Sequence, residues 1–324
     1  MAHELEMRAD RSACMAFVNE KPWHGLGVEV PAGATPQEFL EAAGLDWTVK
    51  KVPAFIELSE ELPDGRIAYD RIVTDRCALV RSSDNRVLDV VSNDWNVLQN
   101  QEAFSFFNDF TSAADMTMET AGSLKDGGVV WGLARVKESF EVVPGDRVDS
   151  YLLLTNYHMY GRATDIRFTP IRVVCNNTLS LSLGQKAQRA VKVSHRKEFD
   201  GDAVKLLLGV AAEKLSKYKE VAQFLAGHRY TDEQAVEYAM RVFPLPPKSE
   251  KDISKNAARL LEVIDEQPGH AFAECSWWNA YNAVSYMTDH ELGRTADTRL
   301  QSAWYGHSAD LKVGALNLAK EMAA

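Results

Sequence analysis

The chain has 324 residues, of which 46% are hydrophobic, so it is long enough to form two domains with a sizeable core. Lys and Arg total 36 against 46 Asp and Glu, and the formal net charge of -10 excludes a protein that is basic throughout, such as a nucleic-acid coat. The apolar runs are shorter than the roughly 20 residues of a membrane helix, and the first residues lack the apolar segment of a signal peptide. We therefore expect a soluble, cytoplasmic protein with no membrane contact.

The four cysteines, Cys14, Cys77, Cys175 and Cys275, are single and far apart. Such spacing is typical of proteins from a reducing compartment, and it lacks the paired cysteines of the usual zinc sites. We therefore expect reduced thiols, no bound metal and no cofactor.

The first part of the chain predicts one short helix and a series of strands. Residues 35–44 carry Thr35 as N-cap, Pro36 at the first helical position and Gly44 after the last turn, which favours a helix. Strand patterns separated by turns follow at residues 47–58, 66–80, 87–91, 116–124 and 129–136. We expect antiparallel pairing, because short turns containing glycine separate these segments.

Residues 99–113 interrupt the series of strands with a helical pattern. Their apolar side chains, Ala103, Phe106, Phe107 and Phe110, recur at helical spacing. The pattern predicts a helix that packs on the sheet through this aromatic stripe.

The stretch 152–183 holds the densest group of polar side chains within one supersecondary unit. Its leucines at 152–154 predict a buried strand, residues 156–161 predict a polar turn, and alternation from Asp165 predicts a second strand. Pro170 favours an edge or a kinked strand there. Beyond it, Asn177 or Thr178 is expected to cap a helix.

A basic block overlaps this unit. Between Tyr151 and Lys197 eight cations accompany a single acid, Asp165. The eight cations are Arg162, Arg167, Arg172, Lys186, Arg189, Lys192, Arg196 and Lys197. A charge run of this kind is commonly a solvated surface, but an arginine-bearing strand that leads into a helix start also suits an anion.

Beyond Gly201 the periodicity becomes helical. Helices are expected over residues 203–225, from Thr231 to the proline cluster, and over 254–267, 276–289 and 308–323. The proline cluster at 244–247 reads as a linker. The sequence therefore predicts an α+β fold, with an antiparallel sheet crossed by helices in residues 1–200 and a helical region in residues 201–324.

Several blocks resemble a known family. They are Trp23-His24-Gly25-Leu26-Gly27, the turn with Asn156 and His158, Arg172-Val173-Val174-Cys175-Asn176-Asn177-Thr178-Leu179, Asn282-Ala283-Val284 with Asp289-His290, and Gly306 with Lys312. In these blocks the chain resembles the phage- and plasmid-encoded family catalogued as domain of unknown function 932. Members usually carry His-Asp-Gly in the turn, whereas His158 is followed here by Met159-Tyr160-Gly161. The resemblance implies a mobile element in a bacterial host cell and implies no reaction.

We expect a protein that binds or anneals single-stranded DNA during recombination or replication, and that works as a homo-oligomer. Known annealases are similar in broad outline, because they present a basic groove on a small antiparallel sheet crossed by helices and assemble into rings or filaments. The residues expected to contact phosphates are Arg162, Arg167, Arg172, Lys186, Arg189 and Lys192. Tyr157 and Tyr160 are expected to stack on bases.

Two alternatives stay open. An enzyme of unknown reaction would use a polar site of His158, Asn156, Asn176, Asn177, Asp289 and His290, with Arg172 and Cys175 nearby. Against this, a lone cysteine such as Cys175 is commonly a small buried hydrophobe, and Asp289 and His290 have the simpler role of pairing at a helix end. The other alternative is a host-interaction protein with no chemistry.

Overall fold

The structure is a computed structural model, and it describes residues 5–8, 10–19, 26–108, 111, 116–172, 177–178, 191–247, 251–293, 302–303 and 306–324. At residues 138, 172, 177–178 and 204–215 it describes the backbone alone.

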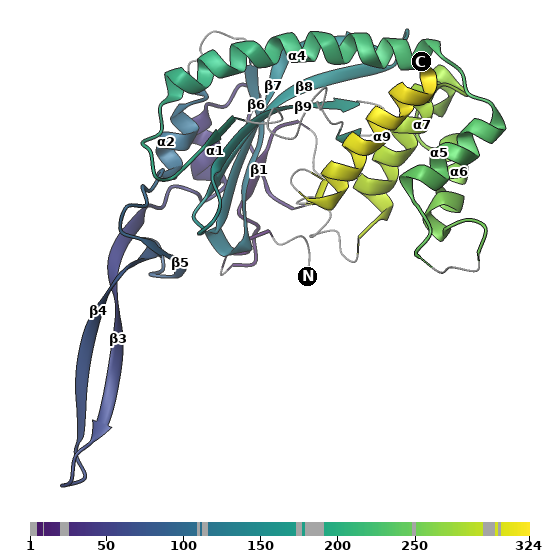
Figure 1. Cartoon of the computed structure of the whole chain (residues 1–324). Helices are drawn as coiled ribbons and strands as arrows, with labels where there is room; N and C mark the ends of the chain where they lie inside the picture. Colours follow the sequence, from purple (N-terminus) through teal and green to yellow (C-terminus); the bar gives the residue numbers. More distant parts are fainter. Residues whose placement is uncertain are drawn as a thin grey trace.

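Two sheets make up the strand-rich part of the chain (Figure 1). The larger sheet has the order β10-β9-β8-β7-β6-β1-β2, and β11 also pairs with β9. Its strands are β1 (Met15–Phe17), β2 (Val28–Glu29), β6 (Met116–Leu124), β7 (Val129–Glu141), β8 (Arg147–Tyr157), β9 (Thr164–Arg172), β10 (Asn177–Thr178) and β11 (Val191–Val193). The smaller sheet consists of β3 (Val49–Glu61), β4 (Ile67–Arg81) and β5 (Val87–Ser92). All pairs are antiparallel except β1 with β2.

Two short helices lie among the strands, and longer ones follow. The helices are α1 (Pro36–Ala42), α2 (Asn100–Ser105), α4 (Gly201–Gly227), α5 (Asp232–Val242), α6 (Lys255–Glu266), α7 (Trp277–Tyr286) and α9 (His307–Ala323). Short 3-10 turns occur at Lys125–Gly127 and His270–Ala273, and α7 continues into a π-helical turn at Met287–Glu291. Within the described residues every strand precedes Gly201, which confirms the predicted α+β fold with a helical C-terminal region. None of the described helices combines the length and apolar composition of a membrane span.

The capping residues of the sequence predicted α1 correctly and the start of α2 closely. The hydroxyl of Thr35 accepts the Glu38 amide and the Glu38 carboxylate accepts the Thr35 amide, so α1 begins with a complete capping box. Gly44 follows α1 with φ of 66°, as its predicted place after the last turn requires. Helix α2 is shorter than predicted, since it ends at Ser105, whose hydroxyl bonds to the Glu102 carbonyl.

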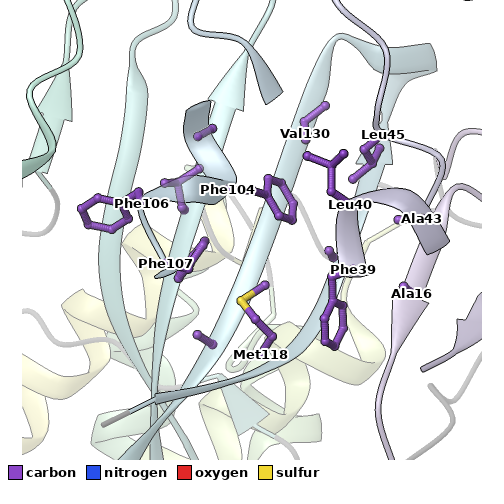
Figure 2. Packing of buried hydrophobic residues seen from close by; sticks show 14 of the residues in the cluster. Ala16, Phe39, Leu40, Ala43, Leu45, Phe104, Phe106, Phe107, Met118 and Val130 are labelled. Atoms are coloured by element: carbon purple, nitrogen blue, oxygen red, sulfur yellow. The ribbon is translucent and has the colours of Figure 1, made fainter. Parts of the chain in front are cut away.

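The central strands β7 and β8 are buried on both faces. On one face the side chains of Val130, Ala134 and Leu152 pack with α1 and α2, whose aromatic rings fill the space above the sheet (Figure 2). On the other face Trp131 and Leu153 pack with the N-terminal segment. Successive side chains of a strand point to opposite faces, which is why neighbours in sequence enter different clusters.

The C-terminal helices form a second core that includes the far end of the same two strands. Val142 and Val148, on either side of the β7–β8 turn, pack with α4, α5, α6, α7 and α9. In that turn the buried carboxylate of Asp146 accepts the indole N–H of Trp278 at 2.8 Å. Helix α4, about 40 Å long at 1.5 Å per residue, runs along the larger sheet to these helices (Figure 1). The proline segment predicted as a linker connects α5 and α6, and both of these helices belong to the second core.

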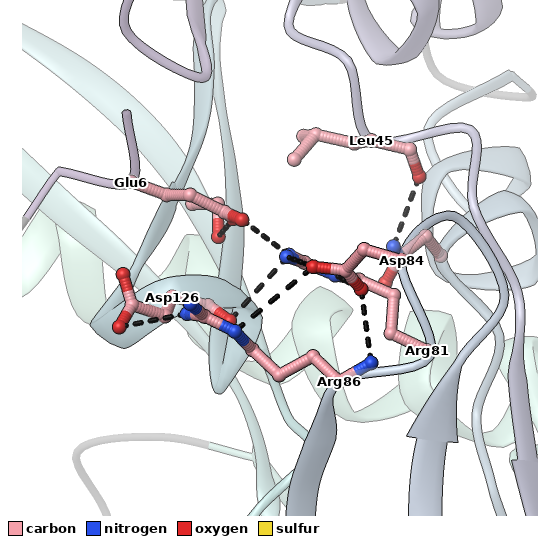
Figure 3. A network of polar contacts seen from close by, with 8 residues as sticks. Glu6, Leu45, Arg81, Asp84, Arg86 and Asp126 are labelled. Carbon is pink, nitrogen blue, oxygen red and sulfur yellow. Dashed lines mark hydrogen bonds and ion pairs between the residues drawn. The ribbon is translucent and has the colours of Figure 1, made fainter. Parts of the chain in front are cut away.

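A buried cation fixes the base of the β3–β4 hairpin to the larger sheet (Figure 3). The Arg81 guanidinium pairs with Glu6 of the N-terminal segment and, at 2.7 Å, with Asp84. The side chains of Arg81 and Glu6 are 7% and 8% exposed, and the Ser123 hydroxyl of β6 donates a second bond to Glu6. The guanidinium also lies over the Trp47 ring, 5.3 Å from its centroid. The cluster thus joins segments that are far apart in the sequence.

We predict that Arg81→Met lowers the free energy of unfolding by about 3–5 kcal/mol, because it leaves the Glu6 carboxylate buried without its cation. Urea unfolding measures the change. The matched control is Arg66→Met, because Arg66 forms an exposed pair with Asp64 and such pairs contribute at most about 1 kcal/mol. The double variant Arg81→Met/Glu6→Gln should recover part of the loss. Equal effects of Arg81→Met and Arg66→Met would show that the buried pair has no special weight.

Candidate nucleic-acid interface and histidine pocket

The predicted two-strand unit is present, and its turn carries two buried polar residues. Strands β8 and β9 flank residues 158–163, in agreement with the prediction of a strand, a polar turn and a second strand. Asn156 is fully buried at the end of β8, where its amide donates to the Leu98 carbonyl at 2.7 Å and its carbonyl accepts from Thr164 at 3.3 Å. These bonds give Asn156 a structural role, since they tie the segment before α2 to the turn.

His158 is fully buried between this turn and α2. Its Nε2 lies 2.9 Å from the Asn100 side-chain oxygen, and its ring lies 5.4 Å from the Trp47 ring. The Asn100 amide nitrogen donates to the Leu45 carbonyl, so the Asn100 oxygen faces His158 as an acceptor. His158 therefore carries its proton on Nε2, and its Nδ1 presents a lone pair. Within the described residues no donor reaches that Nδ1.

His195 repeats this arrangement after β11. Its Nδ1 lies 3.0 Å from the Asn96 carbonyl, which can only accept, so the Nδ1 carries the proton and Nε2 presents a lone pair. Its ring stacks on Trp95 at 4.0 Å. The Nε2 is buried and has no donor among the described residues. Burial lowers the pKa of His195 below its usual value.

His195 lines a cavity of about 730 Å³. The cavity lies between the segment before α2, helix α2 itself, the start of β9 and the loop from β11 to α4. Its polar lining comes from Glu102, Ser105, Thr164, Ser194, His195, Lys197 and Glu198. The Nε2 of His195 is buried, so its lone pair is not exposed in the cavity.

Two of the cations expected at phosphates are exposed at this end of the sheet. Arg162 lies in the turn, and Lys192 is exposed on β11, which pairs with the first residues of β9. Lys197 follows β11 and borders the cavity. Within the described residues, none of these three side chains has a carboxylate at ion-pair distance. The ring of Tyr160, 58% exposed, lies in the same turn.

Two other residues expected to contact nucleic acid, Tyr157 and Arg167, are mostly buried in the structure. Tyr157 is only 5% exposed in the cluster of the N-terminal segment, so it offers no ring face to a base and leaves the expected set of stacking residues. Arg167 is mostly buried and binds both oxygens of Asp165 at 2.6 Å, so its fork is already occupied.

Some expected residues lie outside what the structure describes. Cys175, Asn176, Lys186 and Arg189 are outside the described residues, and so is the helix predicted after Thr178. Only the backbone is described for Arg172, at the end of β9, and for Asn177, in β10.

The polar set expected for an enzyme is divided between the two cores. Asp289 lies after α7 in the C-terminal helices, where its carboxylate accepts from Lys312 at 2.9 Å. The His290 ring is tilted against the Tyr286 ring, with the ring centroids 4.7 Å apart. Burial lowers the pKa of Lys312, while the Asp289 carboxylate acts in the opposite direction. Among the described residues no three His, Cys, Asp or Glu side chains are grouped closely enough to hold a metal.

His195 and the cavity were missed by the sequence reasoning. The local sequence Val193-Ser194-His195-Arg196-Lys197 shows only a histidine in a basic run. Its partner Asn96 is far away along the chain, and no spacing rule connects the two.

We predict that His158 makes the protein acid-sensitive. Burial, and to a smaller extent the nearby His195, lowers the pKa of His158 to about 3 from 6.5. The unfolded chain therefore binds a proton between these values that the folded chain refuses, so stability falls as the pH drops below about 6.5. This residue alone should cost about 2 kcal/mol between pH 7 and pH 5.

Urea unfolding at several pH values measures this effect as a slope. His158→Gln should flatten the dependence of the free energy of unfolding on pH, whatever its effect on stability at pH 7. The control His307→Gln, at an exposed residue, should keep the wild-type slope. An unchanged slope in His158→Gln would refute the assignment.

Comparison with known proteins identifies the family. No curated protein and no solved structure matches the chain. Residues 87–304, well over half of the chain, match the family model described as Domain of unknown function (DUF932). The match includes both buried histidines and the cavity, and it begins after the β3–β4 hairpin. The chain therefore belongs to the DUF932 family, a domain of unknown function.

Proposed function

We propose that this protein binds single-stranded DNA and promotes its annealing, in the setting of a phage or plasmid in a bacterial cytoplasm. The observation that carries the proposal is the group of exposed cations Arg162, Lys192 and Lys197, which have no carboxylate partner among the described residues of an acidic protein. Cations kept free in this way suit phosphates, because each phosphate contact releases a bound counterion.

The pairing of β11 with β9 supports the proposal that these three cations lie at the same end of the sheet. Lys192 of β11 pairs with Asp165 of β9, so it lies beside the start of β9, three residues beyond Arg162. Lys197 follows in the loop to α4. A strand that passes this end of the sheet would meet all three cations, with Tyr160 in the same turn as a ring for a base.

The neighbouring cavity supports a role in holding bases. Its polar lining includes Lys197, the carboxylates of Glu102 and Glu198, and the hydroxyls of Thr164 and Ser194. Exocyclic amino groups and ring N–H groups of bases are donors, so the polar side chains that line the cavity can accept hydrogen bonds from a base there. The architecture is compatible with this reading, because a β6–β9 meander spanned by a long helix matches the broad outline of annealases.

We predict that the triple variant Arg162→Ala/Lys192→Ala/Lys197→Ala weakens binding of a labelled oligo(dT) strand at least about tenfold at low salt, because three phosphate contacts are lost. Fluorescence anisotropy at a series of salt concentrations measures this. The slope of log K against log salt should become smaller by about 2, since each contact on a single strand contributes about 0.7. Annealing of two complementary oligonucleotides should slow in parallel.

The control has the same change in charge far from the cavity. Lys219→Ala/Lys255→Ala/Lys320→Ala removes three cations from α4, α6 and α9 and should leave both measurements unchanged. Wild-type protein that fails to bind at low salt, or equal losses in the two triple variants, would refute the proposal.

A further inference from the structure

The distal part of the β3–β4 hairpin, residues 53–75, projects from the rest of the molecule, and we refer to it as the arm (Figure 1). Strand β5 pairs only with residues 76–80 of β4. In the described structure both edges of the arm are therefore open, with the backbone N–H and C=O groups of β3 on one side and those of β4 on the other. Open edges of this length are templates for pairing with another chain.

The arm carries large apolar side chains on both of its faces. The register pairs Phe55 with Val73 on one face, where Tyr69 and Ile67 follow. Ile56 pairs with Ile72 on the other face, where Leu58 follows. These side chains are about half exposed or more: Phe55 50%, Ile56 53%, Leu58 50%, Ile67 57%, Tyr69 65%, Ile72 48% and Val73 71%. So many large apolar side chains are unusual on a sheet whose two faces are both exposed to water.

A hairpin of this kind needs a cover. An isolated two-stranded ribbon is marginally stable at best in water, and no described residue of the chain forms a layer on either face of the arm. Apolar clustering of this kind marks an interaction surface.

The charges at the tip of the arm indicate which kind of partner can bind there. Beyond the Phe55–Val73 pair both arginines are already bound, Arg66 to Asp64 and Arg71 to Glu57. The remaining carboxylates there are Glu60, Glu61 and Asp70, and no cation of the described residues pairs with them. An acidic tip repels nucleic acid and anionic membranes.

The base of the arm has the opposite charge. Lys50, Lys51 and Arg76 lie there with the single acid Asp75. Two arms laid antiparallel with their apolar faces in contact would bring each acidic tip to the basic base of the other. Such self-complementarity is the requirement for a symmetric contact between identical chains.

We infer that the arm is a self-association element, on which the arm of a second copy of this chain docks antiparallel, tip to base. The contact supplies the oligomer that the proposed function uses, but it does not depend on DNA. It is therefore tested without nucleic acid, so that its failure and the failure of DNA binding are separate results.

The mass of the particle in solution as a function of concentration, from light scattering or sedimentation, tests the inference. The wild-type chain should be at least dimeric at micromolar concentrations. Ile56→Thr/Ile72→Thr keeps β-branched side chains on the arm but removes apolar surface, and it should weaken association at least about tenfold. The control Val87→Thr/Val90→Thr makes the same kind of change on exposed residues of β5, outside the arm, and should associate like the wild type.

Charge exchange tests the orientation. Glu60→Lys/Glu61→Lys makes both ends of the arm basic, and Lys50→Glu/Arg76→Glu makes both ends acidic, so each variant alone should be mainly monomeric. Mixed in equal amounts, the two variants should form a heterodimer, since opposite charges then meet at both ends. A monomeric wild type, or arm variants that associate like the wild type, would overturn the inference. Charge variants that associate alone as strongly as in the mixture would overturn the antiparallel orientation.

Discussion

The central sheet is covered on both faces, and this constraint decides where the molecule can act. Strands β7 and β8 send alternate side chains into the cluster under α1 and α2 and into the cluster of the N-terminal segment. The exposed cations Arg162 and Lys192 accordingly lie in a turn and on the short strand β11, outside the covered faces of β7 and β8. The contrast between Tyr157 and Tyr160 follows from it, because one ring closes β8 inside a core and the other lies in the exposed turn.

The same burial sets the chemistry of the two histidines. Each imidazole donates its one N–H hydrogen bond to a fixed oxygen, His158 to the Asn100 side chain and His195 to the Asn96 backbone. The other ring nitrogen of each keeps a lone pair that no described donor reaches. Neutral imidazoles of this kind are poor sites for charge but good acceptors. The cavity beside His195 is lined by charges of both signs, Lys197 as the cation and Glu102 and Glu198 as the anions.

Charges of opposite sign lie on the arm and on the rest of the molecule. The net charge of -10 conceals a basic edge along β11 and the following loop, while unpaired carboxylates of the arm lie at its far end. Arg81 holds the base of the β3–β4 hairpin against the larger sheet. The two proposed surfaces adjoin at the base of the arm, where the Arg76 guanidinium lies 5.9 Å from the centroid of the Tyr160 ring.

The sequence by itself determined what depends on near neighbours. The cap at Thr35, the hairpin turn at 63–65, the two-strand unit and the C-terminal helices all follow from periodicity and turn residues, which are local. It also predicted Arg162, Lys192 and Tyr160 as binding residues, and all three are exposed in the structure. Only the tertiary structure decided that Tyr157 is buried, that the apolar pattern of β3 and β4 faces water, and that His195 meets Asn96 beside a cavity. The reason is physical: an alternating pattern states which side chains share a face, but what covers that face comes from segments far away in the chain.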